Sequence, residues 1–235
     1  MKKTTKIIIS ISVVLVIALI AVLGYFFIPY SAKRTYNYAL NFVVELKASS
    51  ESVGESFATG VVIKDDGTII TNSHCLHYTK LTEEKMFEKF EVRFAYEDNY
   101  RTVSLVKFDK DLDIAVLKID NKDNLQLKNI KIGSSSGLKA GTDVFAVGNG
   151  SNMGISITSG KISNALVNVE YENIKRQAIQ CDLTITSGNS GGALFDNYGK
   201  LIGITSFRTK DNSGNIIYGI SYAIPINNVM DFVNR

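Results

Sequence analysis

The chain has 235 residues, 45% of them hydrophobic, with 18 glycines, two prolines and two cysteines. This length suits one large domain or two small ones, and two cysteines exclude a disulfide-rich scaffold. The formal net charge of +3 is uneven, because the first 34 residues contain five basic and no acidic residues, which leaves a net charge of −2 on the remainder. A nearly neutral remainder gives no basic surface for nucleic acid, so we expect no nucleic-acid partner.

The first predicted element is an apolar helix near the amino terminus. Residues 7–28 contain no charged residue, and at about 1.5 Å per residue such a helix spans the ~30 Å hydrocarbon core of a membrane. A cleaved signal peptide is the alternative, but its apolar region is usually about 7–15 residues long. We therefore expect an uncleaved single-pass anchor in residues 1–30, with everything after it extracellular, and a short tether over residues 31–40.

From residue 41 onward, short strand-like runs alternate with turn signals. The Asp66-Gly67 dipeptide between two apolar runs is typical of a β-hairpin. Two sets of about six short strands, without a βαβ rhythm, predict two β-barrels at about 41–120 and about 130–224. The polar residues 121–128 form the predicted joint between them.

Two smaller helical features are also predicted. The charged insert at residues 80–90 suits one or two helical turns. A short helix is predicted over 226–235, with Asn227 as a candidate N-cap.

Residues 187–194, with the sequence SGNSGGAL, place Ser190 among three glycines. Glycines around one hydroxyl indicate a backbone with special dihedral angles, as a catalytic serine requires, and the N–H groups of Gly188 and Ser190 are candidate oxyanion donors. A structural glycine-rich turn is the alternative. The stretch also fits the nucleophile elbow of α/β-hydrolases, but that fold places its histidine after the serine, and no histidine follows Ser190.

The two histidines, His74 and His77, both precede the serine. His74 follows the strand-like run at 68–72, and Asp113 begins the apolar run at 113–118. The order His, Asp, Ser is that of chymotrypsin-like proteases, so we expect His74 as general base, Asp113 as its orienting acid and Ser190 as nucleophile. Asp111 is an alternative acid.

The cysteines suggest neither a metal site nor a cross-link. The run from His74 to His77 lacks the spacing of common zinc sites, so we expect no metal and no cofactor. Cys75 and Cys181 fall in different predicted barrels, which favours two free thiols over a disulfide.

Seven segments in this order resemble the protease domain of HtrA/DegP-like trypsin-family serine proteases: TGVVI (59–63), TNSH (71–74), DIAVLK (113–118), ITSGKIS (157–163), IQCD (179–182), GNSGGAL (188–194) and SYAIPI (221–226). The likeness runs from about residue 40 to the carboxyl end. It implies an all-β, chymotrypsin-like double β-barrel, the protease domain being residues 41–235. It also implies catalysis by His74, Asp113 and Ser190, with oxyanion donors Gly188 and Ser190.

The sequence departs from this family in several places. The chain ends at Arg235, where the family continues into a PDZ domain, so PDZ-mediated regulation is not expected. Cys75 and Leu76 replace valines, and the family varies at the 80–90 insert. Asn189 replaces the aspartate of secreted zymogens, so we expect no activation by amino-terminal cleavage.

The resemblance also indicates how a substrate binds. It places Thr184 and Ile185 near the floor of the primary pocket, and matches Ser206, Phe207 and Arg208 to the strand that pairs with an extended substrate. We therefore expect a membrane-anchored endopeptidase that acts on unfolded or extended exported proteins, after small or medium apolar residues. The alternative is a catalytically silent module that binds extended peptides. An oligomer is compatible with the sequence.

Overall fold

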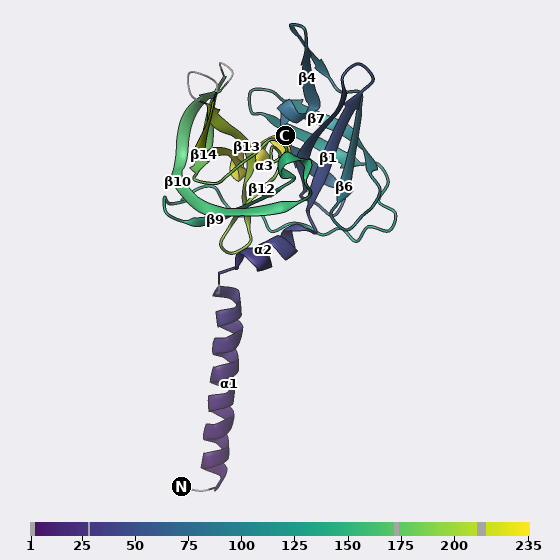
Figure 1. The fold of residues 1–235 in the computed structure, drawn as a ribbon. Helices are drawn as coiled ribbons and strands as arrows, with labels where there is room; N and C mark the ends of the chain where they lie inside the picture. The colour runs from purple at the N-terminus through teal and green to yellow at the C-terminus, as the bar shows by residue number, and fades with distance from the viewer. Residues whose placement is uncertain (1–2, 28, 172–173, 211–214) are drawn as a thin grey trace.

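Two closed, antiparallel β-barrels lie side by side and form the body of the protein (Figure 1). The computed structural model describes residues 3–27, 29–171, 174–210 and 215–235. The six strands of the first barrel are, in order around it, β1 (Val43–Ser50), β2 (Gly54–Val62), β3 (Thr68–Thr71), β8 (Ile114–Ile119), β7 (Arg101–Asp109) and β6 (Lys89–Phe94).

The second barrel repeats this closed arrangement with six other strands. In order around it they are β10 (Ser156–Tyr171), β11 (Ile174–Cys181), β14 (Ile216–Pro225), β13 (Leu201–Lys210), β12 (Ala193–Asp196) and β9 (Asp143–Gly148). The predicted chymotrypsin-like double barrel is therefore confirmed.

Among the described residues, apolar side chains form three cores, one in each barrel and one between the barrels. One fills the first barrel around Leu46 and Phe94, and another fills the second around Ile179 and Leu194. The third joins side chains of both barrels, including Ile70 and Phe195. This explains why all four residues of β3 are buried, because one face of the strand points into its barrel and the other toward the neighbouring barrel.

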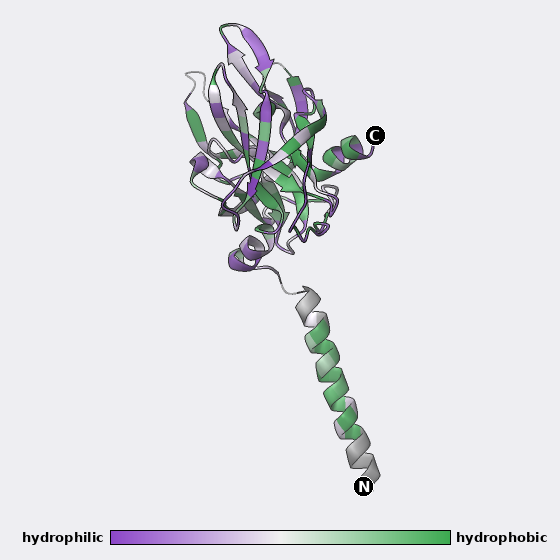
Figure 2. Cartoon of the chain, turned by 90° about the vertical axis from the view of Figure 1, so that its right-hand side faces the viewer, coloured by the Kyte–Doolittle hydropathy of each residue, from purple (hydrophilic) through white to green (hydrophobic). Residues whose placement is uncertain are grey.

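The amino-terminal segment forms helix α1 (Lys3–Phe27), which projects away from the barrels (Figure 1). Its described side chains are largely apolar and exposed from Ile9 to Val22, as the green band in Figure 2 shows. Within the residues that the structure describes, no helix reaches the length and apolar character needed to cross a membrane.

Residues 31–40, expected to form a tether, make a packed helix instead. This helix, α2 (Ala32–Ala39), begins at Ser31, whose hydroxyl accepts a hydrogen bond from the N–H of Arg34. Thr35 and Ala39 are buried, and the Tyr36 hydroxyl donates to the carbonyl of Ile155 at 2.8 Å. The segment is therefore part of the second barrel's surface rather than a loose linker.

Two local predictions were wrong. The insert at 80–90 forms no helical turn, since β4 (His77–Lys80) and β5 (Glu83–Met86) pair as a hairpin that stands above the first barrel (Figure 1). The closing helix α3 (Ile226–Asn234) is present, but its N-cap is Pro225. The side chain of Asn227 instead accepts a hydrogen bond from the N–H of Ser135, which ties the helix to the preceding loop.

Candidate active site

His74 lies at the end of a buried strand. After β3 the chain passes through the extended residue Asn72 into a single 3₁₀ turn, η1 (Ser73–Leu76). Asn72 and Ser73 are buried, whereas the His74 side chain keeps 39% of its exposure. The strand end therefore holds the backbone of His74 firmly while its imidazole faces the cleft.

Asp113 faces this imidazole. Both of its carboxylate oxygens lie 3.0 Å from His74 Nδ1, and Oδ1 also accepts the backbone N–H of His74 at 3.0 Å. The side chain is almost fully buried, and the residue takes the left-handed value φ = 56° that turns its carboxylate toward His74. Asp111, the alternative acid, is exposed. The structure therefore pairs His74 with Asp113.

The pairing shifts both ionisation equilibria. Burial of the ring opposes protonation, but interactions with the neighbouring Cys75 and with the Asp113 carboxylate outweigh it and raise the pKa of His74 well above its ordinary value. Burial also opposes ionisation of Asp113, yet His74 and the hydroxyl of Ser206 lower the pKa of that carboxyl on balance. The carboxylate thus stays charged and keeps the proton of the neutral imidazole on Nδ1.

The loop around Ser190 needs its glycines for steric reasons. Gly188 has φ = +93°, and a Cβ there would lie 2.3 Å from the carbonyl oxygen of Asn149. Gly191 has φ = +82°, and a Cβ there would lie 2.1 Å from the carbonyl oxygen of Thr59. Thr59 in turn fixes the loop, because its N–H donates to the carbonyl of Ser190 at 2.9 Å and its hydroxyl to that of Gly188 at 2.6 Å.

The Ser190 hydroxyl has a hydrogen-bond partner, whereas two nearby backbone N–H groups have none among the described residues. Oγ of Ser190 donates to the carbonyl oxygen of Ser206 at 2.8 Å, and the described residues show no hydrogen bond between this hydroxyl and His74. Over the described chain, neither Gly188 N nor Ser190 N donates to any acceptor, whereas Gly191 N donates to the carbonyl of Thr205. Two backbone donors therefore remain available beside the hydroxyl.

Asn72 connects the elements that carry these three residues, a role that the sequence did not reveal. Its side chain is wholly buried. Nδ2 donates to the carbonyl oxygen of Asp113 at 3.0 Å, and Oδ1 accepts the N–H of Gly191 at 2.7 Å. One amide thus ties the aspartate turn of the first barrel to the serine loop of the second.

His74 and Ser190 open onto one cavity of about 170 Å³, which we call the primary pocket. Four of the predicted substrate-binding residues line it, together with two that were not predicted; the six are Ile185, Ser206, Phe207, Arg208, Thr186 and Ser187. Thr184, by contrast, is exposed and does not line the cavity.

Two of the lining residues also make contacts that sequence reasoning missed. The hydroxyl of Ser206 donates to Asp113 Oδ2 at 2.6 Å, so this residue contacts Asp113 as well as forming part of the pocket wall. Arg208 Nη1 donates to the carbonyl of Ile185 at 3.1 Å, which places a cation at the pocket.

The other chemically interesting side chains have structural partners. His77 donates from Nδ1 to the carbonyl of Ser73 at 2.8 Å and packs against Phe108. Cys75 and Cys181 are free thiols buried in the cores of different barrels. Among the residues that the structure describes, no three His, Cys, Asp or Glu side chains are grouped to hold a metal ion.

An imidazole held by a buried carboxylate at the junction of two barrels, with a serine in the same cavity, defines the chymotrypsin-like class of folds and sites. Residues 58–204 match the family model described as a trypsin-like peptidase domain. The chain belongs to that family.

Its relatives are HtrA-type proteases. It is 34% identical, over 80% of its length and 36% of the relative's, to a probable periplasmic serine endoprotease DegP-like of Pseudomonas savastanoi pv. phaseolicola. It is also 34% identical to the serine endoprotease DegS of Haemophilus influenzae, over 77% of this chain and 50% of that protein. The chain thus spans about a third to a half of these relatives.

A solved structure agrees with these sequence matches. The HtrA-type protease AlgW with tripeptide superposes with a TM-score of 0.74 at 30% identity, over 87% of this chain and 63% of that one. The likeness therefore extends over both barrels.

Proposed function

We propose that this chain is a serine endopeptidase that cleaves unfolded or extended exported proteins after small or medium apolar residues. The observation that carries the proposal is the arrangement of His74. Its Nδ1 is held 3.0 Å from Asp113, while its ring and Ser190 line the same cavity. General-base activation of a serine requires this division of the two ring nitrogens.

The proposed reaction begins by releasing Ser190 from its present partner. In a bound substrate, the N–H of the residue before the scissile bond takes over the carbonyl of Ser206, which frees Ser190 Oγ. His74 Nε2 then accepts the hydroxyl proton as Oγ attacks the carbonyl carbon, and Asp113 stabilises the imidazolium. The N–H groups of Gly188 and Ser190 stabilise the oxyanion.

The reaction is completed by two proton transfers. His74 passes its proton to the leaving amine, and a water molecule then hydrolyses the acyl-enzyme with His74 again as base.

The primary pocket supports an uncharged residue before the cut. None of the described residues that line it is acidic, and Arg208 lies at its wall. A buried lysine or arginine side chain would lack a counter-charge there, which costs several kcal/mol. Ile185 provides an apolar surface for valine, alanine or leucine.

The proposal also includes a membrane location. The uncharged run at residues 7–28 and the exposed apolar side chains of α1 support a single-pass anchor, with the barrels outside the cytoplasm. The full-length protein should keep its original amino terminus and stay with membranes after a high-salt wash. A new amino terminus near Lys33 on soluble protein would show that the segment is a signal peptide.

The catalytic proposal is tested by comparing the wild type with Ser190→Ala on an unfolded protein and on a peptide library. We expect the variant to lose about 10⁶-fold in turnover while keeping its fold, and the library to favour apolar residues before the cut. Activity of the variant within tenfold of the wild type would remove Ser190 from the mechanism.

A second candidate function is peptide binding without cleavage. It is favoured by one observation, that the Ser190 hydroxyl donates to Ser206 rather than to His74. In that case wild type and Ser190→Ala would bind the same peptides equally, and neither would cleave them.

A further inference from the structure

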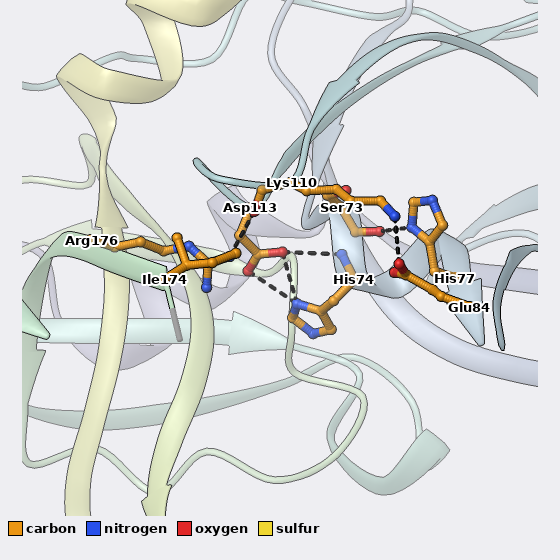
Figure 3. Close-up of a pocket in the computed structure, with 8 residues that line it drawn as sticks. All are labelled: Ser73, His74, His77, Glu84, Lys110, Asp113, Ile174 and Arg176. Atoms are coloured by element: carbon orange, nitrogen blue, oxygen red, sulfur yellow. Dashed lines mark hydrogen bonds and ion pairs between the residues drawn. The ribbon is translucent and has the colours of Figure 1, made fainter. Parts of the chain in front are cut away.

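A second cavity of about 140 Å³ opens beside His74, and the figure shows its charged lining (Figure 3). Among the described residues, His74 is the one that it shares with the primary pocket. We call it the charged pocket, because Glu84, Lys110 and Arg176 line it. We propose that the charged pocket binds an acidic side chain of the substrate, on the residue that precedes the one held in the primary pocket. This inference rests on the proposed function.

The position follows from the geometry of an extended peptide. Successive side chains of a strand point to opposite faces. A peptide that pairs with Ser206 to Arg208 and places one side chain in the primary pocket therefore directs the preceding side chain to the other face. We assign that side chain to the charged pocket, because this cavity shares His74 with the primary pocket.

The acidic and basic side chains that line this pocket differ in whether they already have partners. Lys110 Nζ contacts Glu84 Oε2 at 2.5 Å, and each of these side chains keeps 48% of its exposure. The carboxylate of Asp113 is already engaged by His74 and by the hydroxyl of Ser206. His77 donates its Nδ1–H to a backbone carbonyl. Among the described lining residues, two cations thus face one carboxylate that His74 does not engage, that of Glu84, and Glu84 is itself paired with Lys110.

Arg176 supplies the second cation from the other barrel. Its Nε and Nη2 donate to the carbonyl oxygens of Asp111 and Lys110, at 2.7 and 2.6 Å. These contacts hold the guanidinium at the edge of the pocket and leave Nη1 without an acceptor among the described residues. A planar guanidinium fixed in this way is suited to a carboxylate ligand.

Glu84 occupies Lys110 in the absence of substrate. Because Lys110 is its hydrogen-bond partner, the pKa of Glu84 is held below its ordinary value, so the carboxylate is charged at neutral pH. A substrate carboxylate must share or displace this internal one. Glu84 therefore weakens acid binding, whereas Lys110 strengthens it, and the two residues have opposite effects on the same preference.

The test uses two short peptides with valine before the scissile bond. They differ only in the residue before that valine, which is glutamate in one and its neutral isostere glutamine in the other. We expect the wild type to favour glutamate in kcat/KM. Interactions of partly exposed charges indicate a change of about two- to fivefold, so Glu84→Gln should raise the glutamate-to-glutamine ratio by about that factor and Lys110→Gln should lower it. The preference should also weaken as salt is added.

Two additions separate this inference from the proposed function. The remote exposed variant Lys139→Gln changes the net charge equally and should leave the ratio unchanged. Dissociation constants for both peptides are measured on Ser190→Ala, so the pocket is tested even if no cleavage occurs. If Ser190→Ala binds the glutamate peptide more tightly and the wild type cleaves neither peptide, the result would support the charged pocket and refute the endopeptidase proposal. A ratio near one, equal shifts in Lys110→Gln and Lys139→Gln, or binding of neither peptide would overturn the inference.

Discussion

We predict that replacing Asn72 by alanine weakens the connection between the Asp113 turn of the first barrel and the Ser190 loop of the second. The substitution removes the donor to the carbonyl of Asp113 and one acceptor for the N–H of Gly191. The N–H keeps its second acceptor, the carbonyl of Thr205 at 2.9 Å, so the larger cost falls on the Asp113 carbonyl. A buried polar group left unpaired costs about 1–3 kcal/mol, and the small cavity adds to it.

Asn72→Asp is the matched variant, because it keeps the shape of the side chain. When ionised it still accepts from Gly191, but it places a carboxylate oxygen against the carbonyl of Asp113. Burial and this contact should raise its folded-state pKa above that of the unfolded chain. Its stability relative to the parent is therefore better preserved at low pH, and it is lost as the pH rises through the folded pKa.

Both variants should be measured by urea unfolding in the Ser190→Ala background, which avoids self-cleavage. We expect Asn72→Ala to lose about 2–3 kcal/mol, and Asn72→Asp to show a larger deficit at pH 8 than at pH 5. With Ser190 restored, turnover should fall by about 10²-fold from misplacement of the proposed triad, with a smaller change in KM. Losses below about 0.5 kcal/mol with unchanged turnover would refute the bridging role.

Three further predictions concern the proposed triad and the serine loop. His74→Ala should lower turnover by about 10⁶-fold and His77→Ala far less, as measured on a valine peptide; the reverse ranking would move the base to His77. Because neutral His74 accepts the proton, and Cys75 and Asp113 raise its pKa, the half-maximum of kcat/KM should lie above pH 6.5, the ordinary value for histidine. Asp113→Asn should lower turnover by about 10⁴-fold and move that midpoint downward, and an unmoved midpoint would contradict the pairing. Gly191→Ala places a Cβ 2.1 Å from a backbone oxygen and should lose at least about 2 kcal/mol. Gly219→Ala, at φ = +78° in open space, should lose only about 1 kcal/mol; equal losses would show that the close contact is unimportant.

The candidate site residues were chosen from the sequence by chain order and local pattern. His74, Asp113 and Ser190 each follow or begin a strand-like run, and their order matches only one of the two common serine hydrolase arrangements. The special backbone conformation of the serine loop was predicted from its glycines, because there are few other reasons to place three glycines around one hydroxyl. The structure then gave each a specific contact, such as Gly191 against Thr59.

What the sequence could not predict depends on contacts between distant residues. The bridge made by Asn72 joins positions that lie 41 and 119 residues away. The hairpin of β4 and β5 replaced predicted helical turns, because cross-strand pairing outweighed the local preference of Glu83 to Met86. Thr184 and Ile185 are neighbours, yet only Ile185 lines the pocket, since alternation along the chain turns the other outward.

Labelling with a fluorophosphonate tests the nucleophile most directly, because such reagents react with activated serines and require no knowledge of the natural substrate. The folded wild type should be modified at Ser190, as located by peptide mass spectrometry. His74→Ala and the urea-unfolded chain should react far more slowly. Absence of modification on the folded wild type, or modification at Ser187 with Ser190 untouched, would contradict the proposed mechanism.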